Sequence, residues 1–492
     1  MRFVQRLQCY DPRALAFFAA AYFGLKGAAG GMLRMALLPL FKQVARVSSV
    51  EFQAYAIVVA SPWAMKPLFG MADYFPLFGR RKQWYVLIIS VVGAGAATAL
   101  AYTCKTAHPR TLAVLATIVS LQVATVDILS EGRYAELMTE TPRGKGAIVT
   151  YVWLLTACAE VLVACVAGPV ADDGNVCLLL WAIVPLSAQL IGPVLSGWMM
   201  DPIIAVRKAI DVWTARLAIT IVVATGVVSW AAVRASWQGQ IAVAVSTVLC
   251  LVVAALWFAP SDIAWTLVYT FLASASSLSF SGSLDYFYTS DAHCVPGGPA
   301  FTLTFYLTVA TVSSAACAVV GVVLFETYLS SVQYAPLFRL ATVLRVLVSL
   351  VDIMIVLRWN NAVGITDASA YLFGDACLGT VISMIGSMAM VILTVRVCPP
   401  KTECIVYALI AGSQNLGAAI AALIGNAVSV AANIRLDDTA CTYDNLPLLL
   451  FLGTVVAPIC VLPLTWCIKF PHNTLADDDE NDDDDDQEDQ LE

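Results

Sequence analysis

The chain has 492 residues, of which 60% are hydrophobic and 13% are charged, and its mean hydropathy is +0.80. Soluble domains usually carry about 25% charged residues, so this composition excludes a water-soluble globule and indicates a protein that lies in the lipid bilayer. The formal net charge of −8 comes from the last segment, Ala476–Glu492, which holds 12 of the 35 acidic residues and no basic one. Because a run of like charges repels itself, we expect a disordered acidic tail over residues 471–492.

Apolar runs of about 20 residues, the length that crosses a bilayer as a helix, recur about fourteen times. The predicted spans cover residues 14–41, 50–71, 83–103, 111–138, 146–170, 176–197, 214–236, 240–258, 261–287, 300–327, 337–357, 370–396, 403–432 and 446–468. We predict an all-α polytopic membrane protein with an N-terminal six-helix bundle (1–200), a linker with two additional spans (201–260) and a C-terminal six-helix bundle (261–470). The loops Tyr74–Arg80 and Tyr334–Arg339 share a pattern at matching positions, which favours two related halves.

The distribution of basic residues predicts the orientation. With a cytoplasmic N-terminus, the inner segments carry roughly twice as many Lys and Arg residues as the outer loops, as the positive-inside rule requires. The even number of spans then places the C-terminus in the cytoplasm too, and we expect the plasma membrane as the location. Three cysteines, Cys104, Cys294 and Cys441, fall in outer loops, and the sequence leaves open whether they form a disulfide.

Signatures of enzymes and ATP-driven pumps are missing from the sequence. It has no Gly-x4-Gly-Lys-Ser/Thr phosphate loop, no His-Glu-x2-His pair and no metal-ligand spacing. We therefore expect neither an enzyme nor a bound cofactor or metal, and a transporter that uses a gradient or runs downhill.

Ionisable residues inside the spans are the candidate functional residues. Each costs at least about 2.5–3.5 kcal/mol at the bilayer centre unless it is paired or hydrated. Arg345 with Asp352, seven residues apart on one face, and Arg133 with Glu136 are interpreted as structural ion pairs. The remaining candidates are Lys26, Arg34, Lys66, Asp127, Glu131, Glu160, Asp285 and Asp375.

Two of these candidates are also compatible with an ion pair. Lys26 and Glu160 match in depth, and they form either an ion pair or two groups that face a water-filled cavity.

Asp127 and Glu131 form a predicted proton-coupling pair. They lie one helical turn apart on the same face, where mutual repulsion favours protonation of one carboxylate. Arg133 lies about 200° farther round the helix from Glu131, so it is not expected to neutralise the pair. The aromatic run Tyr286–Tyr288 is either an interfacial belt or a substrate platform.

Several segments resemble one family along nearly the whole chain. They are Ser61–Asp73 (SPWAMKPLFGMAD), Asp285–Tyr288 (DYFY), Gly298–Phe301 (GPAF), Arg358–Asn360 (RWN), and Tyr407–Gly412 (YALIAG) with Asn415 and Gly417. This series resembles the folate–biopterin transporter family, a branch of the major facilitator superfamily, in the manner of the protozoan pteridine and folate transporters. The residues Gly70, Asp73, Arg80 and Arg81 resemble the loop motif of the superfamily, with a longer spacing between Asp73 and Gly79 than usual.

The resemblance implies proton-linked uptake of folates, pterins or, in some members, S-adenosylmethionine, by alternating access between two helical bundles. It places spans 1, 2, 4 and 5 around the cavity, opposite spans 9, 10, 12 and 13, and puts Arg345 and Asp352 on a supporting helix. The residues that it implies for substrate binding are Lys26, Arg34, Lys66, Glu160, Asp285, Asp375 and Asn415.

Three functions remain open from the sequence. The first is import of folate or pterin substrates coupled to protons. The second is transport of S-adenosylmethionine or another small metabolite by the same fold. The third is a receptor or scaffold that does not transport, although a scaffold would not need buried charge in both halves.

Overall fold

The computed structural model describes residues 2–75, 77–78, 82–140, 147–201, 210–330, 332–399, 403–437 and 441–468. The predicted acidic tail and the motif residues Arg80 and Arg81 lie outside these residues.

The chain begins with the helices of its first half. These are α1 (Arg2–Leu7), α2 (Pro12–Ala19), η1 (Ala20–Gly30), α3 (Gly31–Pro39), η2 (Leu40–Val44), α4 (Ser49–Ala64), α5 (Lys66–Gly70), η3 (Met71–Tyr74), α6 (Gln83–Thr103), α7 (Pro109–Glu140), α8 (Ala147–Asp172), α9 (Val176–Ala188) and α10 (Ile191–Leu195). We call them the N-terminal helices. The central hairpin follows with α11 (Val212–Arg234) and α12 (Trp237–Phe258).

The second half contains the C-terminal helices and one small hairpin. Its elements are α13 (Ser261–Ser276), α14 (Ser281–Thr289), η5 (Thr304–Val309), α15 (Ala310–Leu324), η6 (Phe325–Leu329), α16 (Tyr334–Val356), α17 (Trp359–Ala362), α18 (Asp367–Ala370), η7 (Tyr371–Gly379), α19 (Thr380–Val397), α20 (Glu403–Ala431), β1 (Arg435–Leu436), β2 (Cys441–Thr442), α21 (Leu446–Leu450), η8 (Phe451–Val456), α22 (Ala457–Val461) and α23 (Leu464–Cys467). The strands β1 and β2 pair antiparallel.

Twelve helices in the described part of the chain are long and apolar enough to cross a membrane. The protein is therefore a multi-pass membrane protein. The predicted count of fourteen is not confirmed, because α4 with α5 and the helix α16 fall outside the twelve. Charged side chains reduce the apolarity of both, with Glu51 and Lys66 in the first and Arg339, Arg345 and Asp352 in the second.

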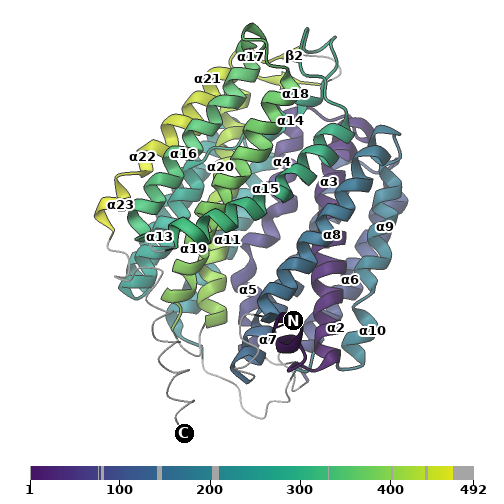
Figure 1. Ribbon diagram of the computed structural model, residues 1–492, viewed down its shortest axis with the longest axis vertical. Coiled ribbons are helices and arrows are strands. Elements are labelled where there is room, and N and C mark those ends of the chain that lie inside the picture. Colours follow the sequence, from purple (N-terminus) through teal and green to yellow (C-terminus); the bar gives the residue numbers. More distant parts are fainter. Residues whose placement is uncertain are drawn as a thin grey trace.

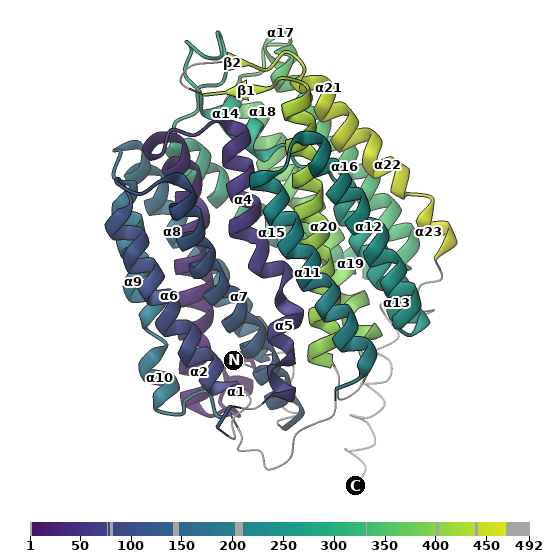
Figure 2. The ribbon, with the colours of Figure 1, turned by 180° about the vertical axis from the view of Figure 1, so that it is seen from behind.

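The helices run side by side, with β1, β2, α14 and α17 at one end of the bundle and α1 near the other (Figures 1 and 2). Along the outside, large apolar side chains such as Trp230, Leu249 and Trp257 are exposed. Such an apolar surface suits contact with lipid tails rather than water.

The central hairpin packs across the seam between the two halves. Leu217 and Ile221 of α11 and Leu251 of α12 share one buried core with Ile57 of α4 and Leu416 of α20. Figure 2 shows α11 and α12 in front of α20, with α4 on the side of α11 and α13 on the side of α12. The two additional spans thus bridge the N-terminal and C-terminal helices.

One predicted span, 261–287, is broken into α13 and α14 by residues 277–280. Backbone groups freed by such a break need partners, because the hydrocarbon region offers no water. The side chain of Gln53 on α4 supplies two of them, since its Nε2 donates to the Ser279 carbonyl at 2.8 Å and its Oε1 accepts from the Gly282 amide at 3.1 Å. At Gly425 of α20, an added Cβ would lie 2.0 Å from the Ser279 oxygen, so only glycine permits this approach.

Polar contacts join the two halves at the end of the bundle that carries β1 and β2. Asp172 at the end of α8 accepts from the Thr304 amide at 2.7 Å, which caps η5. Lys42 donates to the Thr289 hydroxyl at 2.7 Å, and the Tyr286 hydroxyl donates to the Val47 carbonyl at 2.8 Å. This end of the bundle is therefore closed by hydrogen bonds between the halves.

Two disulfides link helix ends. Cys104 after α6 is bonded to Cys177 in α9, and Cys294 after α14 is bonded to Cys441 in β2. The question that the sequence left open for Cys104, Cys294 and Cys441 is thus answered, and Cys177 is a partner that the apolar run around it concealed.

We expect Cys104, Cys177, Cys294 and Cys441 to resist alkylation in denatured protein until a reductant is added. Intact and peptide mass spectrometry would measure this protection. Cys104→Ser should release the Cys177 thiol for labelling and leave Cys294 protected. Labelling of Cys177 in the unreduced parent would contradict the assignment.

Replacing Gln53 by Leu should lower the free energy of unfolding of the detergent-solubilised protein by about 1–3 kcal/mol, because it leaves buried backbone groups at the helix break without partners. Thermal unfolding followed by intrinsic fluorescence would measure the loss. Gln238→Leu, at an exposed position near the start of α12, is the matched control. Equal stability of the two variants would show that the Gln53 bonds contribute nothing.

Candidate functional site

The most deeply buried charge of the N-terminal helices is the carboxylate of Asp127 on α7. Lys26 Nζ on η1 donates to Asp127 Oδ1 at 2.7 Å, and Lys66 Nζ on α5 donates to Asp127 Oδ2 at 2.8 Å. The Asp127 side chain is inaccessible to solvent, and Lys66 is buried. One carboxylate therefore binds two lysines and ties together three separate helices.

Aromatic rings complete the surroundings of the two lysines. Lys26 Nζ lies 5.3 Å from the centre of the Tyr22 ring and 5.2 Å from that of Trp153, and Lys66 Nζ lies 5.1 Å from that of Trp63. Ring faces attract cations most strongly where water is excluded. These contacts help to hold two ammonium groups beside a single carboxylate.

Glu131 lies at the edge of this cluster. Its Oε2 is 3.8 Å from Lys66 Nζ, too long for a hydrogen bond, and together with Lys26, Tyr134 and Trp153 it borders a gap too small for a water molecule. The prediction that Arg133 stays away from the pair holds, since Arg133 bonds to Glu136 instead. Sequence reasoning did not foresee that Lys26 and Lys66 bind Asp127, and the role of Asp127 and Glu131 in proton coupling stays a prediction.

Of the two alternatives left open for Lys26 and Glu160, an ion pair or two groups that face a cavity, the ion pair is not formed. Glu160 Oε1 accepts from Arg34 Nη2 at 2.5 Å, which leaves Lys26 to Asp127. The neighbouring Gly27 is packed against α8, where an added Cβ would meet Ala159 at 2.6 Å. Lys26 instead lies between α7 and α8, with its ammonium bonded to Asp127 of α7 and close to the Trp153 ring of α8.

The ion pair predicted between Arg133 and Glu136 is confirmed, with Nη1 2.9 Å from Oε2. Lys82 Nζ contacts the other oxygen of Glu136 at 2.5 Å, and Asp201 accepts from the Lys82 amide at 2.7 Å. This group lies toward the end of α7, away from Asp127.

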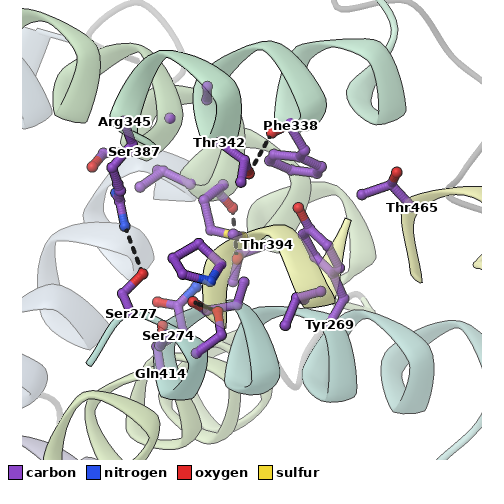
Figure 3. A pocket seen from close by; sticks show the side chains of 18 of the residues that line it. Tyr269, Ser274, Ser277, Phe338, Thr342, Arg345, Ser387, Thr394, Gln414 and Thr465 are labelled. Carbon is purple, nitrogen blue, oxygen red and sulfur yellow. Dashed lines mark hydrogen bonds between the residues drawn. The ribbon is translucent and has the colours of Figure 1, made fainter. Parts of the chain in front are cut away.

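Two cavities lie among the C-terminal helices. The first has a volume of about 330 Å³ and is bounded by α13, α16, α19, α20 and α22 (Figure 3). The second has a volume of about 370 Å³ and is bounded by η5, α15, α16 and η7. Both volumes fall in the range of small-molecule sites.

The predicted ion pair between Arg345 and Asp352 is also wrong. Seven residues of helix separate their Cα atoms by about 10.5 Å along the axis, which is too far for an ion pair. The Arg345 guanidinium donates to the Ser277 hydroxyl at 3.3 Å, and Asp352 accepts from the Tyr288 hydroxyl at 2.5 Å. Arg345 lines both cavities, so α16 lines the cavities rather than acting as a supporting helix.

Three carboxylates of the C-terminal helices lie near tyrosines. Asp285 accepts from the Tyr306 hydroxyl at 2.7 Å, and Asp352 and Asp375 line the second cavity with Tyr306 and Tyr371. Within the described residues, none of the three carboxylates forms an ion pair. The tyrosine Tyr288 is buried against Phe301 and Tyr371, so the run 286–288 is internal and not an interfacial belt.

Several candidate residues lie in π-helical segments, which often occur at functional sites. Lys26 lies in η1, Tyr306 in η5 and Asp375 in η7. The wider turn changes the direction in which following side chains point, and no sequence pattern predicted it.

The remaining predicted residues are Asn415, Gly70 and Asp73, of which Asn415 and Gly70 lie outside the charge cluster around Asp127 and line neither cavity. Asn415 on α20 uses both amide hydrogens for the carbonyls of Trp63 at 3.3 Å and Ala411 at 2.9 Å, so it joins α20 to α4. Gly70 ends α5, and Asp73 lies in the following turn η3 with its side chain outside the described atoms.

Sequence reasoning missed the residues around the first cavity. Tyr269, Ser277 and Gln414 are polar residues inside apolar helices, and that was the available signal. Uncharged polar residues are too common in apolar helices for this signal to single them out without the fold.

Comparison with known proteins gives one family. Residues 26–489 match the BT1 family. The folate-biopterin transporter of Synechocystis sp. is 24% identical over 449 residues, which cover 90% of this chain and 78% of that protein. The probable folate-biopterin transporter 6 of Arabidopsis thaliana is 22% identical over 405 residues, covering 80% of this chain and 71% of that protein.

Solved structures with a similar fold are transporters. The crystal structure of an auto-inhibited POT family peptide transporter superposes with a TM-score of 0.63 at 11% identity, covering 94% of this chain and all of that one. The D-xylose-proton symporter gives a TM-score of 0.53 at 13% identity, covering 96% of this chain and 99% of that one. At these identities the likeness shows the fold alone, which is the predicted major-facilitator-like one. Since the match to the family extends over nearly the whole chain, the chain belongs to the BT1 family of folate–biopterin transporters.

Proposed function

We propose that the protein imports folate or pterin substrates by alternating access, coupled to protons. The observation that carries this proposal is the combination, in a transporter fold, of a buried charge cluster among the N-terminal helices with cavities of small-molecule size among the C-terminal helices, which Arg345, Asp352 and Asp375 line. Burying charge in a membrane is costly, so a protein that only served as a scaffold would gain nothing from it.

The closed end of the bundle supports alternating access. Hydrogen bonds donated by Lys42 and Tyr286, and one that Asp172 accepts, join the halves at the end that carries both disulfides. Since disulfides form in oxidising compartments, this end is proposed to face outward, with both termini in the cytoplasm and the protein in the plasma membrane. Substrate would then leave toward the cytoplasm in the conformation described.

Glu131 is the proposed proton carrier. Asp127 is held by two lysines and is inaccessible to solvent, whereas the Glu131 side chain is 16% accessible and has only the distant Lys66 as an ion-pair partner among the described residues. A proton on Glu131 would weaken its attraction to Lys66 and so alter the balance of charge around Asp127. Asp127 then serves as the fixed anion of the cluster.

The second candidate function is transport of a cationic metabolite such as S-adenosylmethionine. It is favoured by the carboxylates Asp352 and Asp375, which line the second cavity and have no ion-pair partner within the described residues. A cation in the second cavity would compensate for their charge.

Cells that express the chain should accumulate labelled folate and biopterin above cells that lack it, with faster uptake at acidic external pH. Uptake of folate, biopterin and S-adenosylmethionine, normalised to the amount at the cell surface, would measure this. Accumulation of S-adenosylmethionine alone would support the second candidate. Accumulation of none of the three by well-expressed protein would contradict the proposal.

Glu131→Gln should abolish uphill uptake and most of the pH dependence while it preserves exchange of substrate across the membrane, because the neutral amide imitates a permanently protonated carboxyl. Reconstituted vesicles with and without a pH gradient would separate uptake from exchange. Asp127→Asn should abolish both, since it leaves two lysines without their carboxylate. Glu51→Gln, which preserves the capping box of α4, is the control. A Glu131→Gln variant that still concentrates substrate would place the coupling elsewhere.

A further inference from the structure

Arg345 differs from four other basic residues of the helices. Lys26, Lys66, Arg34 and Arg133 each have a carboxylate partner. Arg345 has none within the described residues, although it lies in the middle of α16. An uncompensated arginine within a membrane protein is expensive and marks a functional site.

The guanidinium of Arg345 is available to a ligand. Arg345 is exposed, and it lines both cavities. Of its five N–H donors, one bonds to Ser277, at the break between α13 and α14 (Figure 3). The planar fork of arginine fits a carboxylate with two parallel hydrogen bonds.

The wall of the first cavity suits a polar organic molecule. Its lining includes hydroxyl and amide side chains and the aromatic rings of Tyr269 and Phe338, which lie across the pocket from Arg345 in Figure 3; the labelled residues there include Tyr269, Ser274, Thr342, Ser387, Thr394 and Gln414. Asp352 and Asp375 line the second cavity, on the other side of Arg345. A ligand with its carboxylate at Arg345 can therefore reach acceptors for its own N–H groups.

We propose that Arg345 binds a carboxylate of the transported molecule and so determines preference for organic anions over uncharged relatives. The inference rests on the proposed function, because it takes a folate-type substrate as the source of the carboxylate. It moves anion recognition from Lys26 and Lys66, whose ammonium groups are bound to Asp127, to the C-terminal helices.

The test compares purified full-length protein with its Arg345→Gln and Arg345→Lys variants. Thermal shift and competition binding would use folate, p-aminobenzoylglutamate, which is the carboxylate arm alone, and biopterin, which has no carboxylate. We expect Arg345→Gln to weaken binding of the two carboxylates by about 10- to 100-fold, the loss typical of a hydrogen bond to a charged group. Biopterin binding should stay unchanged, and Arg345→Lys should give an intermediate loss because it retains charge without the fork.

Arg339→Gln is the matched control on the same helix. Its guanidinium is satisfied by the Thr465 hydroxyl at 2.8 Å and the Thr465 carbonyl at 3.1 Å, and it stacks on Trp466. Relative to the parent protein, the control should show no selective loss of binding of the carboxylates compared with biopterin. Unliganded melting temperatures identify any variant that fails to fold, in which case the Arg345→Lys variant decides.

The outcomes separate this inference from the proposed function. Equal losses for folate and biopterin in Arg345→Gln, or no loss, would overturn the role of Arg345 and leave the function intact. Binding of p-aminobenzoylglutamate through Arg345, without binding of either pterin, would overturn the pterin assignment and leave this inference standing. If none of the carboxylates shifts the melting temperature of the parent protein, the inference is wrong.

Discussion

The contact of Asp127 with two lysines is the interaction on which the N-terminal helices depend. A lysine in hydrocarbon is tolerated only if its charge is compensated, and here one carboxylate compensates two such charges. The three residues come from η1, α5 and α7, so the positions of three helices are fixed by one group. The net charge of this trio is positive, and Glu131 at its edge is the nearby carboxylate that can balance it.

In the C-terminal helices, the carboxylates Asp285 and Asp352 are bonded to uncharged groups rather than to cations. Both accept hydrogen bonds from tyrosines, and Arg345 stands apart from both. Tyrosine hydroxyls provide polarity without charge, so they can satisfy a carboxylate and still leave its charge, or its proton, available. The two halves are thus both helical bundles, but the charges inside them have different partners. In the N-terminal helices the charges form ion pairs with one another, whereas in the C-terminal helices charged side chains line the cavities.

Irregular backbone occurs where helices of the two halves meet. The break between α13 and α14 is satisfied by Gln53 from the opposite half, and Gly425 of α20 allows its close approach. The single span predicted over residues 261–287 is therefore two helices, because tertiary partners replace the missing helical hydrogen bonds. The break also brings Ser277 to Arg345, which connects the packing of the seam with the candidate site.

The sequence by itself determined that this is a multi-pass helical membrane protein of the folate–biopterin transporter type, because apolar length and ordered motifs are properties of the linear chain. It also predicted the pair Arg133 and Glu136, whose spacing of three residues makes the contact local. Pairs between different helices could not be predicted in this way: Lys26 and Glu160 matched in depth, yet rotation about the helix axis turned Lys26 toward Asp127. The disulfide partner of Cys104, the break at residues 277–280 and the isolation of Arg345 were likewise decided by the tertiary structure, since each depends on which helix faces rest against one another.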